Sequence, residues 1–270
     1  MRCIFCKNDS SNSRSVEHII PESLGNTSKI LPKGVVCDSC NNYFARKVEK
    51  PFLEAPALMS LRFHQAIPNK RSIIPPISGV LSPGFPVTAY RYVKGPFVGM
   101  INVPFDAVEH IFQNDGGTLI LPGSGQPPSD KIISRFLAKA ALESMAQRLL
   151  DAPGGIDYIV DEPQLDLIRN HARRGDIPNW PHHSRRIYDA DEKWIDEFGS
   201  EVQMVHESEI LQTTWGEWFF VLAIFGLEFV INYGGPEIEG YQRWLSENNG
   251  SSPLYVGKNK ASSRLRQPAS

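Results

Sequence analysis

The chain has 270 residues, of which 41% are hydrophobic and 21% are charged, and its formal net charge at pH 7 is −2. This length allows a sizeable core or one core plus a small satellite, and the near-neutral charge excludes a uniformly basic protein that coats nucleic acid. The first 50 residues are locally basic, because eight Lys and Arg side chains stand against five Asp and Glu. Such a segment fits either a polyanionic ligand or a plain solvated surface.

The four cysteines form two Cys-x-x-Cys pairs near the N-terminus, Cys3 with Cys6 and Cys37 with Cys40. Each pair makes a tight turn that aims two sulfurs at one point, and two such turns complete the tetrahedron that Zn²⁺ prefers. Four thiolates leave no open position on the metal. The sequence therefore predicts a structural zinc that fastens a segment too short to fold on its own core. Two disulfides or free thiols are the alternative.

Between the two pairs stands the stretch "SVEHIIPESLGN", residues 15–26, in which an acid precedes a histidine. We expect a short strand over "SVEHII", with Val16 and the isoleucines as anchors, and a helix over about residues 38–50 with an apolar face. A strand packed on that helix would bring Glu17 and His18 near Asn41, which directly follows the last cysteine.

The stretches "CIFC", "EHIIPESLGN" and "CDSCNNYF", in this order and spacing, resemble the HNH endonucleases, in particular those with a four-cysteine zinc site. The resemblance covers roughly residues 1–50 and implies a ββα-metal finger. It also implies that Glu17 and Asn41 hold a catalytic divalent cation, Mg²⁺ or Mn²⁺. His18 would then be the general base that activates water.

Two features depart from the family pattern. Glu17 stands where Asp is the commoner acid, and the middle Asn that orients the base falls near Pro32, which has no polar side chain. The His18 ring could instead be held by a backbone carbonyl near Lys33 or Gly34, or by Asn26. These alternatives stay open from the sequence.

Other residues near the motif have competing interpretations. Asn41 could instead cap the helix, and Asn42 is its rival as metal ligand. Glu49 is either a distant support for the site or a surface acid. Four basic residues are candidates for phosphate contacts, with a solvated surface as the alternative: Lys33, Arg46, Lys47 and Lys50.

The remaining chain predicts a larger α+β domain. The stretch "IPNKRSIIPPISGVLSPGFP" (67–86) indicates a linker, and the turn-separated apolar runs over 86–121 predict antiparallel strands with a helix over "PFDAVEHIF". Residues 129–150 predict a core helix with one apolar stripe. The run "WGEWFFVLAIFGLEFVINY" (215–233) predicts two buried strands that meet near Gly226, since Glu217 and Glu228 argue against a membrane span.

Further helices are expected over "EPQLDLIRNHARRG" and "GPEIEGYQRWLSEN", and the tail after about residue 257 is expected to be disordered. The predicted architecture is a zinc-stapled ββα finger over residues 1–52, followed by a mixed α+β domain over 53–270 that has no assigned role. The predicted location is the cytoplasm, since no signal peptide is visible.

The leading hypothesis is an HNH-type endonuclease that acts on nucleic acid, most simply DNA. An activating partner or a homodimer is expected, because an unregulated nuclease would harm its host. The second hypothesis is a zinc-stapled module that binds nucleic acid or protein without catalysis, and Pro32 is its best support. A zinc-dependent hydrolase for another substrate is disfavoured, because the four cysteines close the zinc shell.

Overall fold

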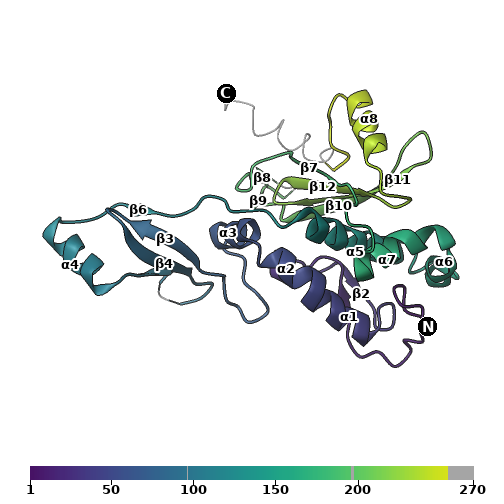
Figure 1. Cartoon of the computed structure of the whole chain (residues 1–270), viewed down its shortest axis with the longest axis horizontal. Helices are drawn as coiled ribbons and strands as arrows, with labels where there is room; N and C mark the ends of the chain where they lie inside the picture. Colours follow the sequence, from purple (N-terminus) through teal and green to yellow (C-terminus); the bar gives the residue numbers. More distant parts are fainter. Residues whose placement is uncertain (96, 196–197, 255–270) are drawn as a thin grey trace. The chain divides into compact units, whose positions relative to one another are not determined.

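The computed structural model describes residues 1–95, 97–195 and 198–254, so the tail predicted to be disordered lies outside the described residues. Helices and antiparallel strands are mixed, and the predicted α+β class is confirmed (Figure 1). The chain forms two compact units. The first holds Met1–Pro21, Asn26–Lys50 and Ser129–Ser270, and the second holds Glu22–Gly25 and Pro51–Pro128.

This division differs from the predicted one, because the N-terminal finger packs in one unit with the chain from Ser129 onward. The boundary after residue 52 stays a prediction about which parts fold independently. The two compact units describe which segments pack together. Whether residues 1–52 and 53–270 fold independently is tested by expressing each of them alone.

The N-terminal segment has the predicted order of strand, strand and helix. Strand β1 (Glu17–His18) pairs antiparallel with β2 (Ile30–Leu31), and helix α1 (Asp38–Phe44) follows. The helical path continues through a π-helical turn, Ala45–Glu49, into α2 (Lys50–Leu53). The strand is shorter than expected: of its three expected apolar anchors, Val16 is exposed, and Ile19 and Ile20 are buried beyond the end of β1.

Helix α5 (Asp130–Arg148) is the centre of the first unit. Figure 1 shows it between the sheet that contains β10 (His206–Gln212) and β12 (Leu227–Asn232) and the finger. It contacts β2, the π-helical turn, β12 and α7 (Asp166–Arg174). The expectation of one apolar stripe was incomplete, because packing on several sides also buries polar side chains. Four of these are Ser134, Arg135, Lys139 and Glu143.

The sheet above α5 has the strand order β10-β11-β12-β7 and is antiparallel throughout. The two buried strands predicted around Gly226 are β11 (Trp218–Ile224) and β12 (Leu227–Asn232). Gly226 has φ +74°, and a Cβ there would lie 2.1 Å from the carbonyl oxygen of Tyr188, so the turn requires glycine. Among the described residues, no helix is both long and apolar enough to cross a membrane.

The other elements of this unit include β7 and β10, the edge strands of the sheet. They are α6 (Gly155–Asp161), a 3₁₀ turn at Pro163–Leu165, β7 (His183–Arg186), β8 (Trp194–Ile195), β9 (Glu201–Val202), β10 (His206–Gln212) and α8 (Glu239–Glu247). The helices expected in "EPQLDLIRNHARRG" and "GPEIEGYQRWLSEN" are α7 and α8. The short helix α6 was not predicted.

The second unit contains a sheet with the strand order β5-β4-β3-β6. Its elements are a 3₁₀ turn at Glu22–Leu24, α3 (Pro56–His64), β3 (Ile77–Leu81), β4 (Phe85–Arg91), β5 (Gly99–Asn102), α4 (Phe105–Gln113) and β6 (Leu119–Ile120). The linker interpretation of 67–86 was wrong where β3 runs. Gly79 reads as a breaker in the sequence, but a Cβ there would lie 2.6 Å from the Ile120 carbonyl oxygen, so the close strand approach explains the glycine.

Candidate functional site

The four cysteine sulfurs lie within 4.8 Å of one another, and the Cys6 and Cys37 Sγ atoms are 3.6 Å apart. This spacing is too long for a disulfide and short enough for one metal ion to bind all four thiolates. Backbone amides support the sulfurs, since the Cys37 N–H donates to Cys3 Sγ at 3.3 Å and the Cys40 N–H donates to Cys37 Sγ at 3.5 Å. The cluster can hold a structural zinc.

The thiols affect one another's ionisation, as expected of a site that binds metal through thiolates. The hydrogen bond with Cys40 lowers the pKa of Cys3 to about 4, and the same contact raises the pKa of Cys40. Within the described part of the chain, no other group of three Cys, His, Asp or Glu side chains gathers closely enough to hold a metal. A second cation would therefore need ligands of mixed type.

The acid–histidine pair lies on β1, two residues that pair with Leu31 and Ile30 of β2. Glu17 faces inward and is 5% exposed, whereas His18 is half-buried. This alternation follows from the period of a strand, in which neighbouring side chains point to opposite faces. The pair thus has one member fixed in the interior and one within reach of solvent.

Asn41 lies inside α1 and reaches the strand. Its Nδ2 donates to the Val16 carbonyl oxygen at 2.9 Å, which leaves the amide oxygen as the atom able to bind a metal. The helix cap is Cys37, so Asn41 is not the N-cap. Its rival Asn42 is exposed.

Glu17 has a partner that the sequence analysis missed, the ammonium of Lys139 on α5. The Lys139 Nζ lies 2.8 Å from Glu17 Oε1, 2.8 Å from Glu49 Oε1 and 2.8 Å from Glu143 Oε2. It also donates to the His18 carbonyl oxygen at 3.1 Å. We call these four side chains, Lys139, Glu17, Glu49 and Glu143, the lysine cluster.

The lysine cluster is buried, and its charges are coupled. Burial raises the pKa of Glu17 despite the nearby ammonium, and burial raises the pKa of Glu143 well above its usual range. For Lys139 burial alone would lower the pKa, but the surrounding carboxylates outweigh it and raise the pKa. One oxygen of Glu17, Oε2, is buried and has no hydrogen-bond partner among the described residues. Glu143 Oε1 is likewise buried without such a partner, but it belongs to α5. Glu17 Oε2 belongs to the strand that carries His18, so it is the one that fits a ligand position for a catalytic cation.

Two of the three groups considered for orienting His18, Asn26 and the Gly34 carbonyl, have other partners. Asn26 donates to the carbonyls of Ile20 and Lys29, at 2.7 and 2.9 Å, and its amide oxygen accepts from the chain after it. The Gly34 carbonyl accepts from Ser10 Oγ at 2.5 Å. Asn26 therefore closes the loop between the strands. Among the described residues, His18 is held at its backbone, by its pairing with Ile30 of β2 and by the Lys139 ammonium.

The four basic candidates for phosphate contacts, Lys33, Arg46, Lys47 and Lys50, are all exposed. A hollow of about 350 Å³ lies beside the cysteine cluster, and its lining includes Cys40, Tyr43 and, from α7, Arg173 and Arg174. The two arginines were not identified as candidates from the sequence, because nothing in the chain order indicates that α7 lies beside α1.

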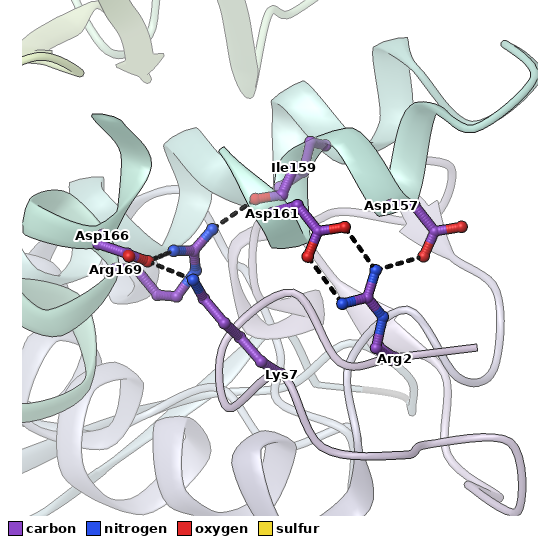
Figure 2. A network of polar contacts seen from close by, with 7 residues as sticks. All are labelled: Arg2, Lys7, Asp157, Ile159, Asp161, Asp166 and Arg169. Carbon is purple, nitrogen blue, oxygen red and sulfur yellow. Dashed lines mark hydrogen bonds and ion pairs between the residues drawn. The ribbon is translucent and has the colours of Figure 1, made fainter. Parts of the chain in front are cut away.

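Charged contacts fasten the first cysteine turn to α6 and α7. Figure 2 shows Arg2 between Asp157 and Asp161, at 2.9 and 2.7 Å, and Lys7 at 2.7 Å from Asp166. We call these contacts the surface clamp, because every member is well exposed. The finger is thus held to the helices at its edge as well as through the lysine cluster.

Arg169, also in Figure 2, is the buried counterpart of this clamp. Its Nε donates to the Ile4 carbonyl oxygen at 2.7 Å, its Nη2 donates to the Ile159 carbonyl oxygen at 2.5 Å, and it also contacts Asp166. The guanidinium therefore satisfies backbone acceptors of both the cysteine turn and α6.

A comparison with known families decides the nature of the finger. Residues 3–56 match the family model of HNH endonucleases. The HNH match contains both cysteine pairs, Glu17, His18 and Asn41, and it extends to the start of α3. No curated protein and no solved structure matches the chain. The HNH family implies a nucleic-acid substrate and the use of a divalent metal.

One sequence pattern could have indicated part of the lysine cluster. The HNH segment supplies Glu17 and Glu49, while Lys139 and Glu143 stand at i and i+4 inside the apolar run "FLAKAALE" of α5. Two opposite charges within a core-facing helix signal a buried pair with further partners. The prediction of one apolar stripe did not include this pair.

Proposed function

We propose that this chain is a divalent-metal-dependent endonuclease of the HNH type, which hydrolyses phosphodiester bonds of nucleic acid, with DNA as the expected substrate. The observation that carries the proposal is the hydrogen bond of 2.9 Å between Asn41 Nδ2 and the Val16 carbonyl oxygen. It holds the first turns of α1 against the strand that carries Glu17 and His18. Both proposed metal ligands and the proposed base thus belong to one small unit.

In this proposal His18 is the general base. A half-buried imidazole at the end of a short strand is reachable by water, and a neutral imidazole accepts a proton near pH 7. The water oxygen forms a bond to phosphorus, its proton goes to His18, and the bond to the leaving oxygen breaks. The leaving oxygen finally takes a proton from solvent.

Glu17 and Asn41 hold the divalent cation, Glu17 through Oε2 and Asn41 through its amide oxygen. A bound Mg²⁺ or Mn²⁺ would neutralise charge on the phosphate and stabilise the departing oxygen. One carboxylate and one amide form a weak, open set of ligands, which the substrate phosphate completes. Lys33, Arg46, Lys47 and Lys50 are proposed to contact backbone phosphates.

The test is cleavage of supercoiled plasmid by the purified, zinc-loaded chain with Mg²⁺ or Mn²⁺, with and without EDTA. His18→Ala should lower the rate by about 10²- to 10⁴-fold, the range for loss of a general base. His64→Ala is the matched control, since His64 is an exposed histidine outside the HNH match. Equal cleavage by the His18 variant would refute the assigned base. Labelled RNA in parallel distinguishes the substrate.

A second candidate is a zinc-stapled module that binds nucleic acid or protein without catalysis. Two observations favour it: Glu17 is already paired with Lys139 at 2.8 Å, and Pro32 offers no polar group to the site. This candidate predicts salt-sensitive binding of DNA by the zinc-loaded chain with no cleavage under any divalent metal. Metal-dependent cleavage that the His18 variant lacks would exclude it.

A further inference from the structure

The lysine cluster joins the HNH segment to a helix that the family match does not reach. Lys139 is completely buried, and its ammonium has four oxygen partners in three elements. Two of those partners belong to consecutive residues, the carboxylate of Glu17 and the carbonyl of His18. An ammonium has three N–H donors, so all of its hydrogen-bonding capacity is used here.

We propose that Lys139 is a positioning residue of the nuclease site, and that α5 thereby completes the HNH finger. The inference rests on the proposed function for its effect on cleavage. Lys139 binds Glu17 Oε1 and leaves Oε2, the orphaned oxygen, as the atom that meets the cation. It also fixes the backbone of His18, which sets where the imidazole begins.

The finger alone gives this pair little support. Strand β1 is two residues long and pairs with a strand of the same length, and an isolated two-stranded ladder is marginally stable at best. A catalytic pair must be held within about 0.5 Å of its productive geometry by groups whose own positions are fixed. Lys139 is such a group, because α5 is packed between the sheet and the finger.

A purely structural role explains the cluster less well. Glu143, one turn away on the same helix, would suffice to neutralise Lys139. Instead the lysine gathers two further carboxylates from the finger, Glu17 and Glu49, and buried charges of this kind usually cost stability compared with apolar packing. The arrangement is therefore better explained by the positions it imposes on Glu17 and His18 than by the stability it adds.

The first experiment compares Lys139→Met with Lys131→Met, an exposed lysine on the same helix, in the full-length, zinc-loaded chain. Plasmid cleavage should fall by about 10²-fold in Lys139→Met, the loss expected for a displacement of about 1 Å at a catalytic group. Lys131→Met should cleave as the wild type does. Zinc content, measured for each protein, reports whether the finger is still formed.

Lys139→Met leaves the buried carboxylates of Glu143 and Glu17 without their partner, so a second variant removes the buried pair of α5, Lys139→Met with Glu143→Met. Because Glu17 still lacks its counter-ion, we expect this double variant to regain part of the lost melting temperature and to keep the zinc content of the wild type, but not to regain its cleavage rate. Recovery of cleavage would overturn the proposal, because Lys139 would then act only as the counter-ion of Glu143.

A third measurement does not depend on catalysis. The imidazole Cε1–Hε1 resonance of His18, assigned by its loss in His18→Gln, should shift or broaden in the double variant and stay unchanged in Lys131→Met. An unchanged His18 resonance in a folded double variant would overturn the positioning role. A wild type that cleaves nothing would favour the binding module over the proposed nuclease, and the resonance would still decide the role of Lys139.

Discussion

The surface clamp and the lysine cluster fasten the same finger to the same helical layer, but they differ in where their charges lie. Arg2 and its two aspartates are 39 to 66% exposed, whereas Lys139 and Glu143 are 0% exposed. Exposed ion pairs contribute about 0–1 kcal/mol, since water already solvates both partners. A buried charge that loses its partner costs about 3–5 kcal/mol. The comparison indicates that the buried contacts fix the geometry of the finger, whereas the exposed contacts at its edge add little to its stability.

The largest effect is expected from loss of the structural zinc, because both sets of contacts depend on a finger that the zinc holds together. In Cys40→Ser the zinc shell loses a ligand, and structural zinc contributes about 10 kcal/mol or more to small zinc-bound folds. We expect loss of zinc and rapid proteolysis within residues 1–50, measured by metal analysis and by mass spectrometry of tryptic fragments. Adding zinc back to chelated wild type is the control. A zinc-loaded, protected Cys40→Ser would show that the metal does not hold the finger together.

The next test removes one buried contact of the finger. Arg169→Met leaves the buried carbonyls of Ile4 and Ile159 without their donor. Each unsatisfied buried group costs about 1–3 kcal/mol, so the free energy of unfolding should fall by about 3 kcal/mol. Urea denaturation with unchanged slope measures this loss. A loss below about 1 kcal/mol would mean that Arg169 contributes no more to stability than the exposed ion pairs of the surface clamp, which would contradict the prediction.

The pH dependence of stability gives a third comparison between buried and exposed groups. Burial, together with the charges of Arg135 and Lys131 and against that of Asp176, lowers the pKa of His171 from 6.5 to about 4. Between pH 6.5 and pH 4, His171 therefore stays neutral in the folded chain and becomes protonated in the unfolded chain. The free energy of unfolding should fall as the pH drops from 6.5 towards 4, by up to about 3 kcal/mol at 1.4 kcal/mol per pH unit.

The measurement is urea denaturation of the zinc-loaded protein at steps from pH 7 to pH 5.5, where the wild type should lose stability progressively. His171→Gln cannot take up the proton and should show a shallower slope, while the exposed His64→Ala should follow the wild type. Parallel slopes in all three proteins would assign the acid sensitivity to other groups, such as the zinc thiolates.

The smallest effect is expected at the surface clamp. Arg2→Met removes the ion pairs with Asp157 and Asp161 and should lower the free energy of unfolding by less than about 1 kcal/mol, with most of that difference lost in 0.5 M salt. Comparison with Arg169→Met keeps the residue type and the interface the same. An equal loss in both variants would break the distinction between the two sets of contacts.

The sequence predicted the parts of the site that are local in the chain. The spacing of the cysteines predicted the four-sulfur cluster, and the period of "NNYFARKVE" predicted the helix that buries Phe44 and Val48. The paired strands around Gly226 were likewise predicted from an apolar run with one glycine. Each of these depends on residues near one another in the chain, where spacing alone carries the signal.

What the sequence did not predict depends on contacts between distant segments. Apart from Glu143 on the same helix, the charged neighbours of Lys139 come from positions 17 and 49, and no local pattern predicts that these meet it. The strand β3 was missed because the prolines on either side of it, together with Gly79, are typical of a loop, although the glycine allows a close approach to Ile120. The roles of Glu17, His18 and Asn41 remain predictions that the cleavage and resonance experiments test.

The distance along the chain between His18 and Lys139 has a consequence for synthesis. The lysine follows the histidine by 121 residues, whereas both cysteine pairs lie within the first 40 residues. Ribosomes add about 5–20 residues per second, so the nascent chain can close its zinc turns roughly ten seconds before α5 emerges. If Lys139 positions the site, the nascent chain has closed its zinc turns while the proposed catalytic residues, Glu17 and His18, are not yet positioned. The order of translation would then delay activity until most of the protein has been made.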